Sequence, residues 1–261
     1  MTNTIDVVVP SSPEEAVASF GDGQGVTIVA GGTIVMPELT AGRLRPARTL
    51  LLAKAGLDTI TTDDGTVRVG AATPVLALVG AVPEPLSTFA SYVGDYEIRG
   101  QATIGGNLCA PPGRESPRGD LQAALLALGA RVRSAGAGGE RTEPVDDFLG
   151  GGEGRLVLEL EIDEPKRSAA AGLGRPHAHA YTVMAVAVAE VADGIRVAVA
   201  GAGPKPQRLP SVEQALADGA DAEAAAAAAA QDVSAHDDAL ASTWYRSRML
   251  PVLVERALTK L

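Results

Sequence analysis

The sequence predicts an α+β protein made of two units, and three stretches of the chain carry this prediction. Near the N-terminus, a strand over residues 4–9, a helix beginning at Ser11 or Ser12 and a strand over 26–30 form a strand–helix–strand unit, which favours parallel pairing. Residues 156–162 read LVLELEI, and this alternation indicates a half-buried strand. Beyond residue 180, an apolar run precedes mostly helical patterns, which indicates a smaller unit of antiparallel strands and helices.

The first unit is predicted to span residues 1–164, in two lobes of about 1–55 and 56–164. The first lobe continues with a helix over 35–41, where Pro37 is tolerated in the first turn, and a strand over 49–52. The second lobe is predicted to contain strands over 66–70, 130–134 and 156–162, and helices over 74–79, 86–92 and from Asp120 onward. Glycine-rich residues 136–139 and 150–154, and residues 145–148, are expected to lie in turns or loops.

The second unit is predicted to span residues 175–261, after a linker over 163–174 that contains Pro165, charged residues and small residues. The apolar run 180–191 fits either a helix or a strand by periodicity. As a strand, it would pair with a strand over 195–200 across a turn at Asp193 and Gly194. Helices are predicted over 212–217, 222–230 and 238–261.

Composition excludes several classes of protein. The 261 residues are 46% hydrophobic but only 3% aromatic, so the core must be aliphatic and rich in alanine. A net charge of −10 argues against a nucleic-acid surface. No apolar run reaches the roughly 18 residues of a membrane span, and the N-terminus lacks the pattern of a signal peptide. The single cysteine, Cys109, suits a reducing cytoplasm, and one cysteine cannot ligate an iron–sulfur cluster.

Two short motifs with paired glycines are the candidate binding elements. Gly31 and Gly32 follow the strand over 26–30, and the stretch 103–107 reads TIGGN, with polar residues on both sides of its glycines. Glycine pairs most often serve turns, so either motif alone is weak evidence. Together, two glycine loops that each let the backbone approach a ligand closely can meet on one polyanion, such as a pyrophosphate.

The order and spacing of these motifs resemble a known family over nearly the whole chain, the FAD-binding medium subunits of molybdenum hydroxylases. The chain is similar to the medium subunit of carbon monoxide dehydrogenase and the flavin domain of xanthine dehydrogenase. The residues that carry the resemblance are 30–33 (AGGT), Ile98-Arg99, 102–108 (ATIGGNL), Asp120-Leu121 and Tyr245-Arg246. The resemblance implies a two-lobed FAD-binding domain of the vanillyl-alcohol-oxidase and p-cresol-methylhydroxylase type. A C-terminal domain of the carbon monoxide dehydrogenase flavoprotein type would follow it.

The resemblance also implies which residues contact FAD. The pyrophosphate would lie on backbone N–H groups and a hydroxyl of the first motif: Ala30, Gly31, Gly32, Thr33, Ile34 and Val35. The opposing clamp would be Thr103, Ile104, Gly105, Gly106 and Asn107. Asp120 would accept hydrogen bonds from a sugar hydroxyl of the adenosine, although its position equally suits a plain helix N-cap. Leu160 would be an apolar contact to the flavin or adenine ring.

The chain departs from the family near the flavin ring. Members usually carry a lysine or tyrosine shortly after the strand of Leu160, whereas residues 169–179 are shortened here and Arg175 is the nearest candidate. Cys109 is interpreted as a small residue without a redox role. His177 and His179 have no third ligand nearby, so no metal site is expected, and no catalytic acid or base is assigned.

The implied function is electron transfer through FAD within a heteromeric molybdenum hydroxylase. Expected partners are a small subunit with [2Fe-2S] clusters and a large subunit with the molybdenum cofactor, assembled as a dimer of heterotrimers. The alternative is a self-contained flavin-dependent reductase or oxidase on the same fold, similar to cell-wall enolpyruvyl reductases, although no serine and glutamate are placed for the acid it needs. A third hypothesis is a scaffold subunit without flavin, against which the two intact glycine motifs argue.

Overall fold

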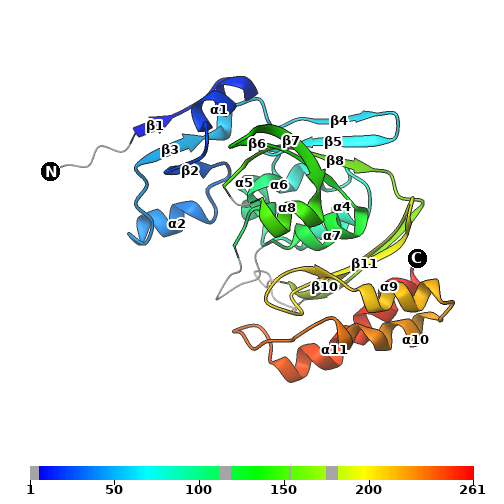
Figure 1. Cartoon of the computed structure of the whole chain (residues 1–261). Helices are drawn as coiled ribbons and strands as arrows, with labels where there is room; N and C mark the ends of the chain where they lie inside the picture. Colours follow the sequence, from blue (N-terminus) through cyan, green and yellow to red (C-terminus); the bar gives the residue numbers. More distant parts are fainter. Residues whose placement is uncertain (1–5, 112–118, 153, 175–181) are drawn as a thin grey trace.

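The structure is a computed structural model that describes residues 6–111, 119–152, 154–174 and 182–261. The described chain contains three separate β-sheets. The strand orders are β1-β3-β2, β4-β5-β8-β6-β7 and β12-β11-β10-β9. Figure 1 shows the first sheet, with its helices, at one end of the molecule and the C-terminal helices at the other. Among the described residues, no helix has the length and apolar character that crossing a membrane requires.

The first lobe is a parallel sheet with a helix on each side, as Figure 1 shows. Its elements are β1 (Asp6–Val8), α1 (Pro13–Phe20), β2 (Val26–Val29), α2 (Val35–Thr40) and β3 (Arg48–Leu51). Ser12 caps α1 by accepting a hydrogen bond of 3.2 Å from the Glu15 N–H, and Pro13 lies in the first turn. The predicted parallel unit is confirmed, with β3 inserted between β1 and β2.

The second lobe is an antiparallel five-stranded sheet that carries six helices. Its strands are β4 (Ile60–Asp63), β5 (Thr66–Gly70), β6 (Arg131–Gly136), β7 (Gly139–Pro144) and β8 (Leu156–Asp163). Its helices are α3 (Val75–Leu78), α4 (Leu86–Tyr92), α5 (Tyr96–Gln101), α6 (Ile104–Leu108), α7 (Leu121–Leu128) and α8 (Val145–Gly151). The prediction of a strand from the alternating sequence of β8 is confirmed, since its apolar residues are buried and Glu159 and Glu161 are half-buried.

Several segments of this lobe differ from their predicted structure. The polar segments that form β4 and β7 carry no apolar alternation and gave no strand signal, and α5 was not predicted. The loop expected at residues 145–148 is wrong, because α8 begins at Val145, with Val145 and Phe148 buried against the core. The turn predicted at 136–139 is confirmed, and Gly138 and Gly139 take positive φ angles of 85° and 89° there.

The C-terminal part is a four-stranded antiparallel sheet followed by helices. Its elements are β9 (Arg167–Gly174), β10 (Thr182–Val191), β11 (Gly194–Ala200), β12 (Gln207–Arg208), α9 (Pro210–Ala217), α10 (Ala222–Ala227), the 3₁₀ helix η2 (Ala228–Gln231) and α11 (Thr243–Thr259). The linker expected over 163–174 is wrong, because Arg167–Gly174 forms β9 and pairs with β10. The open choice for 180–191 is settled as a strand, paired with β11 across the predicted turn.

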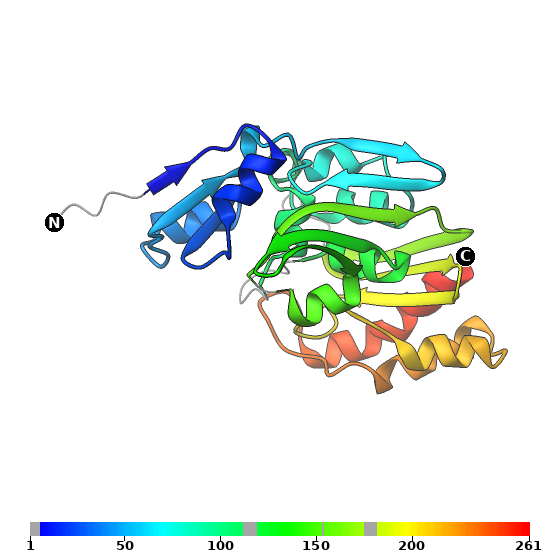
Figure 2. The same cartoon turned by 45° about the horizontal axis from the view of Figure 1, so that its top comes forward.

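The strand β10 is buried on both faces, which explains why its sequence lacks a polar alternation. Met184, Val186 and Val188 pack into the core beneath the C-terminal helices, whereas Ala185 and Ala187 face the core of the second lobe. Figures 1 and 2 show the corresponding layers, with the orange and red helices on the outer side of the sheet and the second lobe on the inner side. The sheet therefore uses large residues toward its own helices and small residues toward α7.

Arg246 of α11 is the largest fully buried side chain and connects three segments of the C-terminal part. Its guanidinium donates to the Val183 carbonyl at 3.1 Å, to the Gly201 carbonyl and to the Asp238 carboxylate. Tyr245, the other residue of this motif, is partly exposed. The interpretation of Tyr245-Arg246 as a structural motif of a docking helix agrees with these contacts.

We expect Arg246→Met to lower the free energy of unfolding by about 3 kcal/mol, because the half-buried Asp238 carboxylate loses its ion-pair partner and the carbonyls of Val183 and Gly201 lose a donor. Arg248→Met is the matched control on the same helix, since Arg248 is exposed and stacks only on Trp244. The control should change stability by less than about 1 kcal/mol. Urea unfolding of both variants measures the difference, and equal losses would contradict a special role for Arg246.

Candidate functional site

A cavity of about 1000 Å³ lies where the first lobe, the second lobe and the C-terminal sheet meet. The first lobe contributes the β2–α2 loop, the second lobe contributes α6 and the start of α7, and the C-terminal part contributes the β11–β12 loop. Eleven of the thirteen predicted site residues line the cavity. These are Ala30, Gly31, Gly32, Thr33, Ile34, Val35, Thr103, Gly105, Gly106, Asn107 and Asp120.

The first glycine motif leaves backbone donors open to the cavity. Gly32 has a φ of 74°, which turns the chain from β2 into α2. Among the described residues, no group accepts a hydrogen bond from the N–H groups of residues 32–35, and Ile34 at the N-cap makes no side-chain cap. These N–H groups lie in the loop that leads into α2 and at the first residue of this helix, and unpaired backbone donors of this kind can bind an anion.

Gly31 has a different task, which is to let the two lobes touch. A Cβ atom at this position would lie 2.0 Å from the Gln101 carbonyl oxygen, at the end of α5. Backbone therefore packs directly on backbone between the β2–α2 loop and the segment that leads into the second motif. The first motif thus reaches the second through the Gly31–Gln101 contact.

The second motif is a helix and not the loop that its glycines suggest. Thr103 caps α6 by accepting a 3.1 Å hydrogen bond from the Gly106 N–H. The N–H groups of Ile104 and Gly105 donate to the carbonyls of Thr73 at 3.0 Å and Ala71 at 2.9 Å. The backbone donors at this end of α6 are therefore already satisfied within the protein. Gly105 and Gly106 show no positive φ, and what the fold requires of Gly105 is close approach, since a Cβ there would lie 2.8 Å from the Ala71 Cβ.

Asn107 connects α6 to α7, a role that the sequence interpretation missed. Its Oδ1 accepts a 2.9 Å hydrogen bond from the Leu121 N–H and so caps α7. The buried Gln122 side chain donates through Nε2 to the Leu108 carbonyl at 2.7 Å and also borders the cavity. The only sequence signal for Gln122 is a polar residue within an otherwise apolar helix.

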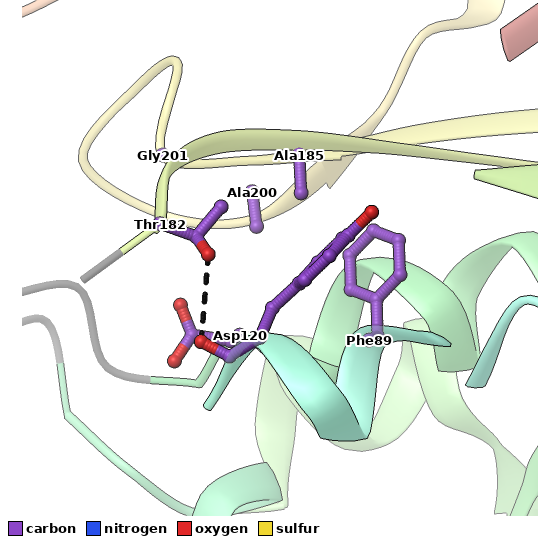
Figure 3. Close-up of a pocket in the computed structure, with 7 residues that line it drawn as sticks. Phe89, Asp120, Thr182, Ala185, Ala200 and Gly201 are labelled. Carbon is purple, nitrogen blue, oxygen red and sulfur yellow. Dashed lines mark hydrogen bonds between the residues drawn. The ribbon is translucent and has the colours of Figure 1, made fainter. Parts of the chain in front are cut away.

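Asp120 precedes α7 but its side chain makes no cap hydrogen bond, so the helix-cap alternative is wrong. Burial raises the pKa of its carboxyl group from 3.8 to about 6. Asp120 also borders a second, small cavity of about 10 Å³, roughly the space of one water. Figure 3 shows Asp120 below Thr182 at one side of this small cavity, with Phe89 at the other. The Thr182 hydroxyl is already used, because it donates to the Tyr92 carbonyl at 3.4 Å.

Two predicted site residues lie in the core and not on the cavity wall. Ile104 is fully buried in α6, and Leu160 is fully buried in β8, where it faces Val69 and Val132 on the neighbouring strands. Leu160 does not line the large cavity, where its own strand β8 contributes Leu156 and Val157. Arg175, His177 and His179 lie outside the described residues.

Two further charged residues of the wall, Asp146 and Arg155, already have partners within the protein. Asp146 lies 4.0 Å from Arg196 and 3.9 Å from Arg208, and these ion pairs join α8 to the C-terminal sheet. The Arg155 guanidinium donates to the Ser134 hydroxyl and to the carbonyls of residues 134, 137 and 139.

Burial raises the pKa of the Cys109 thiol to about 11, so it is protonated at neutral pH although it faces the cavity. Within the described residues, no group of three or more His, Cys, Asp or Glu residues is placed to hold a metal ion.

Comparison with known proteins decides the family. Residues 3–162 match the model of the FAD binding domain in molybdopterin dehydrogenase. The chain belongs to this FAD-binding family of molybdopterin dehydrogenases. Residues 174–261 of this flavoprotein match the CO dehydrogenase flavoprotein C-terminal domain, so the resemblance stated from the sequence is confirmed. No curated protein sequence matches the chain.

Solved structures agree with this assignment. A carbon monoxide dehydrogenase from Hydrogenophaga pseudoflava, which lacks the Mo-pyranopterin moiety of the molybdenum cofactor, matches with 25% identity and a TM-score of 0.84 over 98% of this chain and 96% of the other. Reconstituted CO dehydrogenase from Oligotropha carboxidovorans matches in fold, with 23% identity and a TM-score of 0.83 over 98% and 97% of the two chains. Quinoline 2-oxidoreductase from Pseudomonas putida 86 also shares the fold, with 20% identity and a TM-score of 0.81 over 98% and 96%. The chain is therefore a flavoprotein of the oxidoreductase class with FAD as its cofactor.

We expect Gly105→Ala to lower the free energy of unfolding by about 1–3 kcal/mol and to weaken FAD binding, because the added Cβ displaces α6 from Ala71. Gly100→Ala is the control, since a Cβ at this helical position meets nothing within 4 Å. Alanine there should be neutral or slightly stabilising. Thermal unfolding and FAD titration compare the two variants, and equal behaviour would show that close packing at Gly105 is unimportant.

The raised pKa of Asp120 predicts a stability that depends on pH. The folded chain disfavours the Asp120 carboxylate, so ionisation of this group lowers the free energy of unfolding. The loss is complete above the folded-state pKa of about 6, and it shrinks as the pH falls toward 3.8, the pKa in the unfolded chain. Asp120→Asn should therefore stabilise the FAD-free chain at pH 8 by about 1–2 kcal/mol, and by less at pH 5. Urea unfolding across this range, with the exposed Asp147→Asn as control, measures the effect. A gain that does not increase with pH would refute the assignment.

Proposed function

We propose that the chain is the FAD-binding electron-transfer subunit of a heteromeric molybdenum hydroxylase. The observation that carries this proposal is the cavity between the lobes, which is lined both by residues 32–35, with their open N–H groups, and by Asp120 at the start of α7. The two family matches together span most of the chain and support the same function. The single cysteine is consistent with a cytoplasmic location, which we also propose.

The residues of the cavity fit FAD. Its volume of about 1000 Å³ is at the upper end of the roughly 300–1,000 Å³ of small-molecule sites, as a long dinucleotide requires. Phe20, Ile28 and Leu156 provide apolar wall for a ring, and the β2–α2 loop with the first residue of α2 provides donors for an anion. A cavity with one polar, anion-accepting side and one apolar side suits a cofactor that has both characters.

In this arrangement, each group of the chain has a binding task. The N–H groups of residues 32–35 and the Thr33 hydroxyl hold the pyrophosphate, and the Asp120 carboxylate accepts a hydrogen bond from a sugar hydroxyl. Thr103, Gly105, Gly106 and Asn107 form the opposite wall, which acts through shape because the first backbone donors of α6 are used internally. FAD, when bound, supplies the redox chemistry, while the chain binds it, orients it and keeps water from it. No residue of the chain is assigned as a general acid or base.

The proposed partners are an iron–sulfur small subunit with [2Fe-2S] clusters and a large subunit with the molybdenum cofactor, assembled as a dimer of heterotrimers. The similarity to a carbon monoxide dehydrogenase that lacks the Mo-pyranopterin moiety of its molybdenum cofactor supports a partner of the molybdenum type. One cysteine in the sequence cannot hold an iron–sulfur cluster, so in the proposed assembly the clusters that pass electrons to FAD belong to another chain.

The purified chain is expected to bind FAD non-covalently in a 1:1 ratio and to be yellow. With artificial electron acceptors, the FAD-loaded chain alone should not oxidise organic substrates or carbon monoxide, whereas the complex with co-expressed partner chains should turn over its substrate. A colourless chain that cannot be reconstituted with FAD would defeat the proposal. Steady turnover by the lone chain would instead identify a self-contained flavin-dependent reductase or oxidase.

A further inference from the structure

The loop between β11 and β12 brings a single lysine to the cavity. Pro204, Lys205 and Pro206 are the residues that the C-terminal part contributes to the described wall. Lys205 is exposed, and it is followed and preceded by proline. Proline fixes its own φ and restricts the residue before it, so the backbone around Lys205 has little freedom.

The two ends of this loop are fixed to the protein. At one end, the Gly201 carbonyl accepts a hydrogen bond from the buried Arg246, and a Cβ at Gly201 would lie 2.3 Å from the Val183 carbonyl oxygen. At the other end, the Gln207 side chain donates to the Asp232 carbonyl at 2.6 Å. Lys205 is therefore presented to the cavity from a loop whose position is set by the C-terminal core.

Lys205 differs from Arg155, the other basic residue of the described wall, because Lys205 has no partner among the described residues. Asp146 is paired with Arg196 and Arg208, and the Arg155 guanidinium is bound to the Ser134 hydroxyl and to backbone carbonyls. For Lys205, no ion pair or hydrogen bond is formed within the described part of the chain, and Asp120 is not within ion-pair distance of it. An ammonium group in this position is available to an anion that enters the cavity.

We propose that Lys205 binds the pyrophosphate of the cofactor, so that the C-terminal part of the chain takes part in holding FAD. This inference rests on the proposed function. The pyrophosphate carries two negative charges, and the N–H groups of residues 32–35 approach it from the first lobe only. The first N–H groups of α6 on the opposite wall are already bound to Thr73, Ala71 and Thr103. Lys205 supplies the missing donor and counter-charge from the third side of the cavity.

The test compares Lys205→Met with Lys205→Arg in the full-length chain stripped of flavin. Titrations of FAD and riboflavin, followed by flavin fluorescence at several salt concentrations, measure the affinities. We expect Lys205→Met to weaken FAD binding by about tenfold or more and to reduce its salt dependence, because one charged hydrogen bond is lost. Binding of riboflavin, which has no phosphate, should be unchanged, and Lys205→Arg should restore most of the FAD affinity. Lys54→Met, at an exposed lysine that is not among the residues lining the cavity, is the matched control.

Each other outcome overturns the inference. Wild-type affinity for FAD in Lys205→Met would show that no phosphate contact exists. If Lys205→Met lost FAD and riboflavin binding equally, Lys205 would contact the isoalloxazine ring that the two ligands share. A changed midpoint potential of the bound flavin with unchanged affinity would lead to the same conclusion. The same loss in Lys54→Met would indicate a general effect of net charge. If the wild-type chain itself binds no FAD, the proposed function fails, which is a result distinct from all of these.

Discussion

The fold depends on one helix, α7, which is buried along its whole length between two sheets. All eight of its residues are buried, and seven of them are leucine or alanine that pack into one continuous core with β5, β8, β10 and β11. The alanines of β10 and β11 meet this helix, and their small side chains let the C-terminal sheet approach it closely. Because α7 belongs to the cores of both units, the position of each sheet depends on the other.

This central helix also sets the position of the cavity wall. Asn107 caps α7 and Gln122 reaches back from α7 to the Leu108 carbonyl, so α6 is attached to the helix by one partly buried and one buried hydrogen bond. Asp120 stands one residue before α7 and takes its place from the same attachment. A site built in this way is preorganised, since its wall cannot shift without disturbing the core. The first lobe touches the segment that leads into α6 through the backbone contact between Gly31 and Gln101.

Residue pattern alone predicted the elements whose periodicity is strong, such as the alternating β8, the capped helix α1 and the apolar α7. It missed β9, because the sequence RSAAAGLG has weak strand propensity and is held as a strand only by pairing with β10. Both glycine motifs border the cavity, but the contacts that the structure shows for them are ones that a sequence does not display: Gly31 and Gly105 allow close packing, and Thr103 caps α6. The positions of Lys205 and Gln122 on the wall depend on distant segments, so the sequence did not reveal them, although Gln122 stands out as the one polar residue of α7.

The first lobe has little core of its own. Phe20, Leu50 and Leu52 complete their packing with Leu156 and Leu158 from the sheet of the second lobe. A segment of this size is near the lower limit for independent folding. We therefore expect the local opening of lowest free energy to be separation of the first lobe, as a cooperative unit, from the rest of the folded chain. A molecule bound between the lobes opposes this separation by RT ln(1 + [L]/Kd). Amide hydrogen exchange in β1–β3 should therefore report occupancy of the cavity, and the lobe's local stability becomes a function of cofactor supply.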